Sequence, residues 1–177
     1  MFTFEIASKK SHYNIKYGYA DCYFGKCFVA FSNDAICHLH FVDKESNSHI
    51  QELIKRFPEA NLQEDTTQEA TEVVDNIFVD TNTSKNFRLI LQGTDFQAQV
   101  WQQLCDIPKG QTWSYEDVAV AMNKPKAIRP VANAIASNEI AYLIPCHRVI
   151  AKSGKSKYRW GPDRKISILE REGVHLG

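Results

Sequence analysis

Residues 114–137 read SYEDVAVAMNKPKAIRPVANAIAS, and they set the expectation for the second half of the chain. Ser114 and Asp117 have the spacing of a capping box, with aspartate in place of the usual glutamate or glutamine. A helix is therefore predicted over 115–122. After a short turn, an alanine-rich helix is predicted over 128–137. Two short helices joined by a tight turn are typical of a helix-turn-helix, a motif of DNA-binding proteins.

The first half of the chain predicts a small sheet with helices packed on it. Apolar side chains alternate with other residues in the two earliest segments, and aromatic and β-branched residues dominate the next two, as is typical of strands. The predicted strands cover residues 2–6, 13–19, 24–31, 36–42 and 87–91. Helices are predicted over 48–57 and 67–78, and a further helix begins after the capping residue Thr94.

A polar segment, 80–84, is the best candidate for a linker. It divides the chain into an N-terminal α/β structural domain over 1–85 and a helical domain over 86–177, which carries the helix-turn-helix. Because the strands precede most of the helices, the predicted fold class is α+β.

Composition and cysteine usage exclude several classes of protein. Hydrophobic residues make up 44% and charged residues 24%, as in ordinary globular domains. No apolar run approaches the ~20 residues of a membrane-spanning helix, and the N-terminal MFTFEIASKK lacks the features of a secretion signal. Five cysteines without the spacing of a disulfide framework favour a reducing compartment, so a cytoplasmic protein is expected.

Charge is distributed unevenly, although 21 basic and 21 acidic residues cancel. Residues 1–90 carry 9 basic and 13 acidic side chains, a net of −4, and residues 91–177 carry 12 and 8, a net of +4. The window 124–165 holds ten lysines and arginines against two acidic residues, a net of +8. Such an excess attracts polyanions, nucleic acid above all, but it is equally typical of a solvated basic face.

Residues 138–150, NEIAYLIPCHRVI, carry the candidate chemistry. An apolar strand is expected to lead into the proline, whose ring fixes its own backbone, so that Cys146 follows at a rigid turn. A thiol becomes a good nucleophile when a base raises its thiolate fraction, and His147 can be that base. Because adjacent side chains do not face each other in regular structure, a water would have to bridge them. Glu170 or Glu172 can orient the imidazole.

The residue chemistry alone leaves ordinary structural interpretations open. Cys146 and His147 would then be a buried cysteine beside a structural histidine. Tyr115 would be a core aromatic, Asn138 a helix C-cap and Glu172 a surface acid.

No metal site is predicted. The first half of the chain holds five soft-ligand residues within nineteen positions, namely Cys22, Cys27, Cys37, His38 and His40. Their spacing differs from the tight pairs of zinc sites, and strand cysteines more often behave as small buried hydrophobes. The two histidines would point to the same face of a strand.

Pro-Cys-His-Arg-Val at 145–149 resembles the active-site signature of the O6-alkylguanine-DNA alkyltransferases. The resemblance extends over about 93–173 and is closest to the bacterial branch that includes the C-terminal domain of the adaptive-response protein. The other blocks that match are Ser114-Tyr115, Lys124-Pro125-Lys126-Ala127-Ile128-Arg129, Asn138, Tyr158-Arg159-Trp160-Gly161 and Leu169-Glu170-Arg171-Glu172. The segment from Asp21-Cys22 to Gly25-Lys26-Cys27, followed by Cys37, also resembles that branch.

The resemblance implies a DNA-repair activity, that of a methylated-DNA–protein-cysteine S-methyltransferase. Such a protein transfers the alkyl group of O6-alkylguanine, and of O4-alkylthymine, irreversibly to its own cysteine after flipping the damaged base out of double-stranded DNA. It acts once, as a monomer, without a cofactor. The resemblance also implies a ribonuclease-H-like N-terminal sheet and a C-terminal helix-turn-helix.

The resemblance further implies a role for each matching residue of the reaction centre. Cys146 would be the nucleophile and alkyl acceptor, His147 would deprotonate it through a water, and Glu172 would hold His147. Asn138 would link the recognition helix to the active-site turn. Tyr115 would press on the rotated phosphate and donate a proton toward guanine N3.

On the DNA side, the resemblance implies that Arg129 enters the duplex and fills the gap left by the flipped nucleotide. Ala127 and Ala132 keep the recognition helix narrow, so that its backbone can approach the minor groove without reading sequence. Asn133 lies among them and can bond a phosphate or a base edge.

The pocket for the flipped base would be lined by Val149 and Tyr158, with the backbone N–H of Arg159 facing O6.

Two other classes of function remain as alternatives. A DNA-binding sensor would bind alkylated bases without chemistry, and a thiol hydrolase would use Cys146 and His147 over many turnovers.

Overall fold

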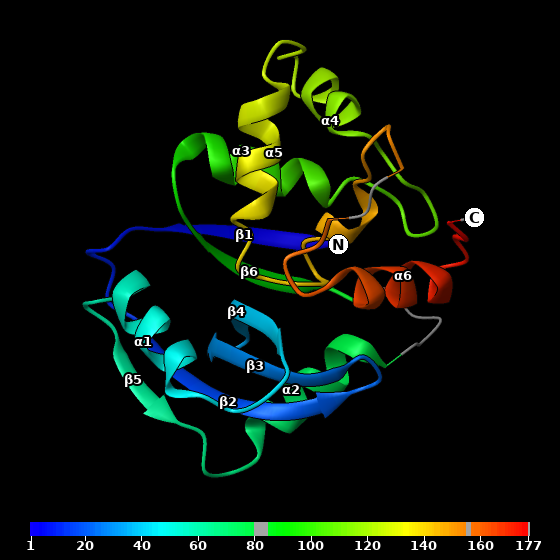
Figure 1. Cartoon of the computed structure of the whole chain (residues 1–177). Coiled ribbons are helices and arrows are strands. Elements are labelled where there is room, and N and C mark those ends of the chain that lie inside the picture. Colours follow the sequence, from blue (N-terminus) through cyan, green and yellow to red (C-terminus); the bar gives the residue numbers. More distant parts are fainter. Residues whose placement is uncertain (80–84, 155–156, 177) are drawn as a thin grey trace. The chain divides into compact units, whose positions relative to one another are not determined.

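The computed structural model describes residues 1–79, 85–154 and 157–176. The chain forms two compact units, 1–93 and 94–177, and the elements of each unit are labelled in Figure 1. The architecture is mixed α/β, with a sheet in the first unit and mainly helices in the second.

The first unit extends beyond residue 85, where the sequence placed a domain boundary. Strand β6 (Phe87–Gln92) pairs with both β1 (Phe2–Ala7) and β4 (Ala35–Val42), so it is an inner strand of the sheet. The compact unit therefore ends only at Gly93. The linker predicted over 80–84 lies outside the described residues.

Within the described part of the chain, six strands form one sheet in the order β1-β6-β4-β3-β2-β5. Strand β3 (Gly25–Ser32) runs antiparallel to β2 (Asn14–Cys22) and to β4, whereas the pairings of β6 with β1 and β4 are parallel. The five predicted strands are confirmed. Strand β5 (Asn61–Glu64) was not predicted, because Leu62 is the one apolar residue in it, but it adds a short parallel edge beside β2.

Two helices pack against the sheet of the first unit, as predicted. Helix α1 (Asn47–Arg56) buries Leu53, which joins Phe28 and the residue after the helix, Phe57, in a core on one face of the sheet. Helix α2 (Glu69–Phe78) packs on strand β2, where a Cβ atom at Gly18 would lie 3.0 Å from the Cβ of Ala70. Glycine allows this close approach, because a side chain there would require Ala70 to shift by a few tenths of an ångström.

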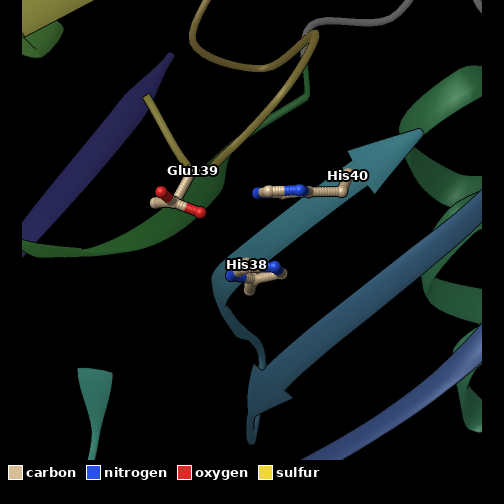
Figure 2. Close-up of side chains that lie close together, drawn as sticks. All are labelled: His38, His40 and Glu139. Atoms are coloured by element: carbon tan, nitrogen blue, oxygen red, sulfur yellow. The ribbon is translucent and has the colours of Figure 1, made fainter. Parts of the chain in front are cut away.

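His38 and His40 lie on the same face of β4, as the alternation of a strand requires. Their two rings, which Figure 2 shows, are stacked, with centroids 4.1 Å apart and planes inclined by 10°. Phe28 of β3 lies edge-on to His38, and His49 of α1 lies 5.4 Å from the Phe28 ring. The pair thus belongs to a cluster of rings that joins the sheet to α1.

The second unit is built around three helices. Helix α3 (Asp95–Leu104) and α4 (Tyr115–Ala121) both pack against α5 (Ile128–Ala136), and the indole N–H of Trp101 donates to the Ala134 carbonyl at 2.8 Å. A single turn of 3-10 helix, η1 (Cys146–Arg148), and helix α6 (Pro162–Arg171) complete the unit. The helices predicted over 115–122 and 128–137 are confirmed to within one residue at their ends.

Capping boxes fix the start of two of these helices. The Ser114 hydroxyl accepts from the Asp117 N–H at 3.0 Å, and the Asp117 carboxylate accepts from the Ser114 N–H at 2.8 Å. Thr94 and Gln97 exchange the same two bonds at the start of α3, at 3.1 and 2.9 Å. The capping box predicted for α4 is thereby confirmed.

Among the described helices, none combines the length and the apolar character that crossing a lipid bilayer would require.

Replacing Thr94 by alanine should destabilise the second unit by about 1 kcal/mol, because the first turn of α3 loses the side chain that satisfies its free N–H group. Equilibrium unfolding in urea, followed by tryptophan fluorescence, measures the loss, because all three tryptophans lie in the second unit. Thr94→Ser keeps the hydroxyl and is the control. Equal losses in the two variants would contradict the assignment of the cap.

Candidate active site

The turn that carries the cysteine is held by main-chain pairing with the segment before α4. The Trp113 N–H donates to the Arg148 carbonyl at 2.9 Å, and the Trp113 carbonyl accepts from the Ile150 N–H at 2.9 Å. The apolar segment 140–145 before it was expected to be a strand, and that expectation is wrong: it forms successive turns. Cys146 therefore starts a turn of 3-10 helix rather than ending a strand.

The side chain of Asn138 stabilises the turns over 140–145 by hydrogen bonds to their main chain. Its side chain is almost fully buried, and its Nδ2 donates to the carbonyls of Ile140 and Ile144 at 3.1 and 3.3 Å. Its Oδ1 accepts from the Ile140 N–H at 2.9 Å. These bonds satisfy main-chain groups that a strand would have paired with a neighbour. Nδ2 also lies 3.4 Å from the Sγ of Cys146, which makes the amide a direct contact of the thiol.

A buried carboxylate, that of Glu172, lies behind the histidine. It immediately follows α6 and is 3% exposed, and its two oxygens lie 3.1 and 3.3 Å from Nε2 of His147. Arg148 donates to the same oxygens from Nε at 3.0 Å and from Nη2 at 2.7 Å, in a bidentate pair. Glu170, the other candidate, is exposed.

The electrostatics of this group set the protonation states. Burial alone would raise the pKa of Glu172, but the hydrogen bonds from His147 and Arg148 lower it to about 2, so the carboxylate is ionised. Burial lowers the pKa of His147 despite the opposing effect of Glu172. A neutral imidazole that donates Nε2–H to Glu172 has an unprotonated Nδ1. Within the described residues, that buried Nδ1 makes no hydrogen bond.

Cys146 is buried, and burial raises the pKa of its thiol. The hydrogen bond from Asn138 and the positive charges of Lys165 and Arg159 act in the opposite direction. Lys165 is 1% exposed, and its Nζ donates to the carbonyls of Val149 and Lys157 at 2.7 and 2.9 Å. A buried ammonium group thus lies close enough to the thiol to stabilise a negative charge there.

Two features of the site are not predictable from the motifs in the sequence: the role of Lys165 and the contact between Arg148 and Glu172. One signal for Lys165 was present: it shares the apolar face of α6 with Ile168 and Leu169, which are three and four residues further on. A lysine at a core position needs partners. No local pattern reveals the second contact, because it joins residues 24 positions apart.

A cavity of about 670 Å³ opens at Cys146. It brings together the predicted reaction residues Cys146 and Tyr115, the predicted pocket residues Tyr158 and Arg159, and Ala132 and Asn133 of α5. The remaining lining residues are Ile135, Ala136, Ala151, Ser153 and Lys157.

The side chains of the cavity are held in place from behind. Burial and the nearby Cys146 raise the pKa of Tyr115, so its hydroxyl stays protonated at neutral pH. The Arg159 guanidinium donates to the Asn138 carbonyl at 2.8 Å and to Glu139 at 2.9 Å, which leaves its main chain as the part available to a ligand. The ring of Tyr158 lies edge-on to that of His147.

Six of the predicted site residues do not line the cavity. His147, Asn138 and Glu172 belong to the hydrogen-bonded group described above, and the other three are Val149, Ala127 and Arg129. Val149 is 1% exposed, and its carbonyl accepts from Lys165. Ala127 and Arg129 lie at the start of α5, and the Arg129 side chain is exposed.

Comparisons with known proteins identify the family of the chain. Residues 95–174 match the family model described as 6-O-methylguanine DNA methyltransferase, DNA binding domain. The chain is 43% identical over 162 residues to the bifunctional transcriptional activator/DNA repair enzyme Ada of Escherichia coli, covering 89% of this chain and 45% of that protein. It therefore spans about half the length of that curated relative.

Two further proteins are matched over most of their length. The chain is 41% identical over 133 residues to the inducible methylated-DNA–protein-cysteine methyltransferase of Bacillus subtilis, covering 71% of this chain and 74% of that one. The crystal structure of the O6-methylguanine methyltransferase of Mycobacterium tuberculosis superposes with a TM-score of 0.71 at 30% identity, over 89% of this chain and 92% of that one. The same protein in complex with DNA gives a TM-score of 0.69 at 31% identity, over 92% of each chain. By sequence and by structure, the chain belongs to the family of the methylated-DNA–protein-cysteine methyltransferases.

Proposed function

We propose that this chain repairs DNA by transferring an alkyl group, methyl above all, from O6 of guanine in double-stranded DNA to the Sγ of Cys146. The transfer forms a thioether, which does not reverse, so each molecule acts once. The observation that carries the proposal is that the thiol of Cys146 faces a cavity large enough for a base, with an imidazole and a buried carboxylate in series behind it.

Activation of the thiol follows from the protonation states of its neighbours. The raised pKa of Cys146 and the lowered pKa of His147 favour a neutral thiol beside a neutral imidazole at rest. A water relays the thiol proton to Nδ1 of His147 as the sulfur attacks the alkyl carbon. Glu172 then balances the positive imidazolium, and Lys165 with Asn138 stabilises the developing thiolate.

The leaving guanine needs a proton because its departure from the alkyl carbon leaves a negative charge. Tyr115 supplies it toward N3, as a phenol whose raised pKa keeps it protonated until the base is in place. Tyr158 packs on the flipped base, and the backbone N–H of Arg159 faces O6. The main chain of Cys146 completes the pocket.

Helices α4 and α5 act as a helix-turn-helix that places α5 in the minor groove. Ala127 and Ala132 keep the approaching surface narrow, and Asn133 bonds a phosphate or a base edge. Arg129 enters the stack where the damaged base has left. A base that reacts at O6 has to leave the duplex, at a cost of a few kcal/mol, and a planar charged side chain offsets part of that cost.

The remaining properties that we propose are those implied by the resemblance to the family. The sheet of the first unit is ribonuclease-H-like and has a structural role. DNA binding and chemistry belong to the second unit, from Thr94 onward, rather than to all of 86–177, because Phe87–Gln92 is a strand of the first unit. The protein acts in the cytoplasm as a monomer, accepts O4-alkylthymine as a second substrate, and uses no cofactor because the thiol itself takes the alkyl group.

Incubation with duplex DNA containing O6-methylguanine should make the protein heavier by one methylene, located on Cys146, and should stop after one equivalent of DNA. Intact-protein and peptide mass spectrometry measure both. Cys146→Ser should bind the DNA and stay unmodified. Binding by the natural chain without a mass change would favour the sensor, and repeated turnover the hydrolase. Alkylation of Cys22 or Cys105 instead would refute the assignment.

Arg129→Ala should slow repair about tenfold or more, because the cost of flipping the base is no longer offset. Affinity for undamaged duplex should fall much less. Single-turnover rates and fluorescence anisotropy measure the two effects. Lys126→Ala, which removes an exposed positive charge nearby, is the control and should lower rate and affinity together. Equal losses of rate and affinity in Arg129→Ala would argue against its insertion into the duplex.

Glu172→Gln should slow transfer and destabilise the protein by about 3–5 kcal/mol at pH 7, because Arg148 loses its buried partner. The pKa of Glu172 is about 2 in the folded protein and is higher in the unfolded chain. The stability that the carboxylate provides is therefore complete above the unfolded pKa of about 4.3 and is lost as the pH falls toward 2. Urea unfolding across this pH range should show that the free energies of unfolding of the variant and of the natural chain approach each other as the pH falls.

The exposed Glu170→Gln variant is the control for Glu172→Gln and should leave stability and rate unchanged. A Glu172→Gln variant as stable as the natural chain at pH 7, or a difference that does not change with pH, would contradict the account of the buried carboxylate.

A further inference from the structure

The β2–β3 hairpin of the first unit carries two cysteines that the proposed repair reaction does not use. In its register, Cys22 lies opposite Gly25, and Cys27 lies opposite Ala20, so the two cysteines are diagonal neighbours on one face of the hairpin. Gly25 has no side chain, which leaves room for the Cys22 side chain to lean toward its neighbour. The two Sγ atoms lie 3.6 Å apart, in van der Waals contact, and both are thiols in the structure.

The two thiols differ in their access to solvent. Cys22 is partly exposed at the end of β2, next to the turn residue Tyr23, which is 69% exposed. Cys27 is fully buried, and its partner on the next strand is Phe41. The Phe41 ring contacts that of Phe24, at 6.3 Å between centroids. A small molecule from solvent can therefore reach the first sulfur but not the second.

We propose that Cys22 and Cys27 form a reversible disulfide by exchange with low-molecular-weight disulfides of the glutathione type. The Sγ of Cys22, as thiolate, attacks one sulfur of glutathione disulfide, and one glutathione leaves as a thiol that takes up the proton released by Cys22. The Sγ of Cys27 then attacks the Sγ of Cys22 in this mixed disulfide. The second glutathione leaves with the proton of Cys27, so two protein thiols are oxidised and one disulfide is reduced to two thiols.

The position of the pair at the end of the sheet allows the bond to close. A disulfide needs its sulfurs at about 2.05 Å, so the Cys22 side chain has to move toward Cys27. Strands β2 and β3 are joined by the two-residue turn at 23–24, so Cys22 is the last residue of its strand and lies at the end of the hairpin. Because the loop that the bond would close is so short, the bond would add little to the stability of the fold. These features suit a reversible reaction better than a permanent link.

The remaining cysteines are poorly suited to the same reaction. Burial raises the pKa of the Cys37 and Cys105 thiols to about 12, and it raises the pKa of Cys146 as well. Exchange needs a thiolate that can reach the disulfide. Oxidation at the hairpin should therefore leave Cys146 reduced and available for its own reaction.

Incubating the full chain with glutathione disulfide, blocking the remaining thiols with N-ethylmaleimide and digesting it for mass spectrometry tests the proposal. We expect the protein to lose two hydrogens, with Cys22 and Cys27 recovered in one disulfide-linked peptide and the other three cysteines blocked by maleimide. Reduced glutathione should restore both thiols. This readout involves no DNA, so its outcome is independent of the proposed repair function.

Two variants separate the steps. Cys27→Ala should trap glutathione on Cys22 as a stable mixed disulfide, because the second sulfur is missing. Cys22→Ala should take up no glutathione, because the buried thiol is out of reach. Cys105→Ala is the matched control and should behave as the natural chain does. These expectations require folded variants, which circular dichroism checks, but the linked peptide of the natural chain tests the proposal without them.

A lasting glutathione adduct on Cys22 of the natural chain, a disulfide that includes any other cysteine, or five cysteines that all remain open to maleimide would each overturn the proposal.

Discussion

The active site depends on one buried carboxylate, that of Glu172. It ties the end of α6 to the turn that carries the cysteine, because it accepts two hydrogen bonds from Arg148 and one from His147. An ionised acid can be buried at this depth only when its oxygens are satisfied in this way. The same bonds fix the plane of the imidazole and decide which of its nitrogens carries the proton. The geometry of the reaction centre and the stability of the second unit therefore rest on the same group.

With Glu172 in place, the site holds groups that can stabilise the charges of the reaction before those charges have formed on the thiol and the imidazole. The thiol and the imidazole are neutral, and a buried positive group, Lys165, is held by two carbonyls. Asn138 places its amide at the sulfur by the same bonds that shape the turn before it. For the single use that we propose, this arrangement is an advantage, because a buried neutral thiol is protected from other electrophiles until a substrate fills the cavity.

Local patterns were enough to predict much of the fold. The capping box at Ser114 and the helices on either side of the turn follow from side chains that bond within three residues, so the sequence carries them directly. The segment 140–145 was misjudged because its apolar character suggested a strand, whereas the side chain of Asn138 takes up its main-chain groups. The partners of Glu172 and Lys165 were accessible only through the family resemblance or not at all, since these contacts join residues 8 to 25 positions apart.

The most direct test of this account is the protonation state of His147 in the resting protein. Long-range proton–nitrogen NMR of the 15N-labelled chain near pH 7 distinguishes the two neutral tautomers from the imidazolium, with the signal assigned by its absence in His147→Gln. The account predicts a neutral ring that carries its proton on Nε2, directed at Glu172, with a bare Nδ1. A proton on Nδ1, or a charged ring at this pH, would contradict it, because no base would then be available to the thiol.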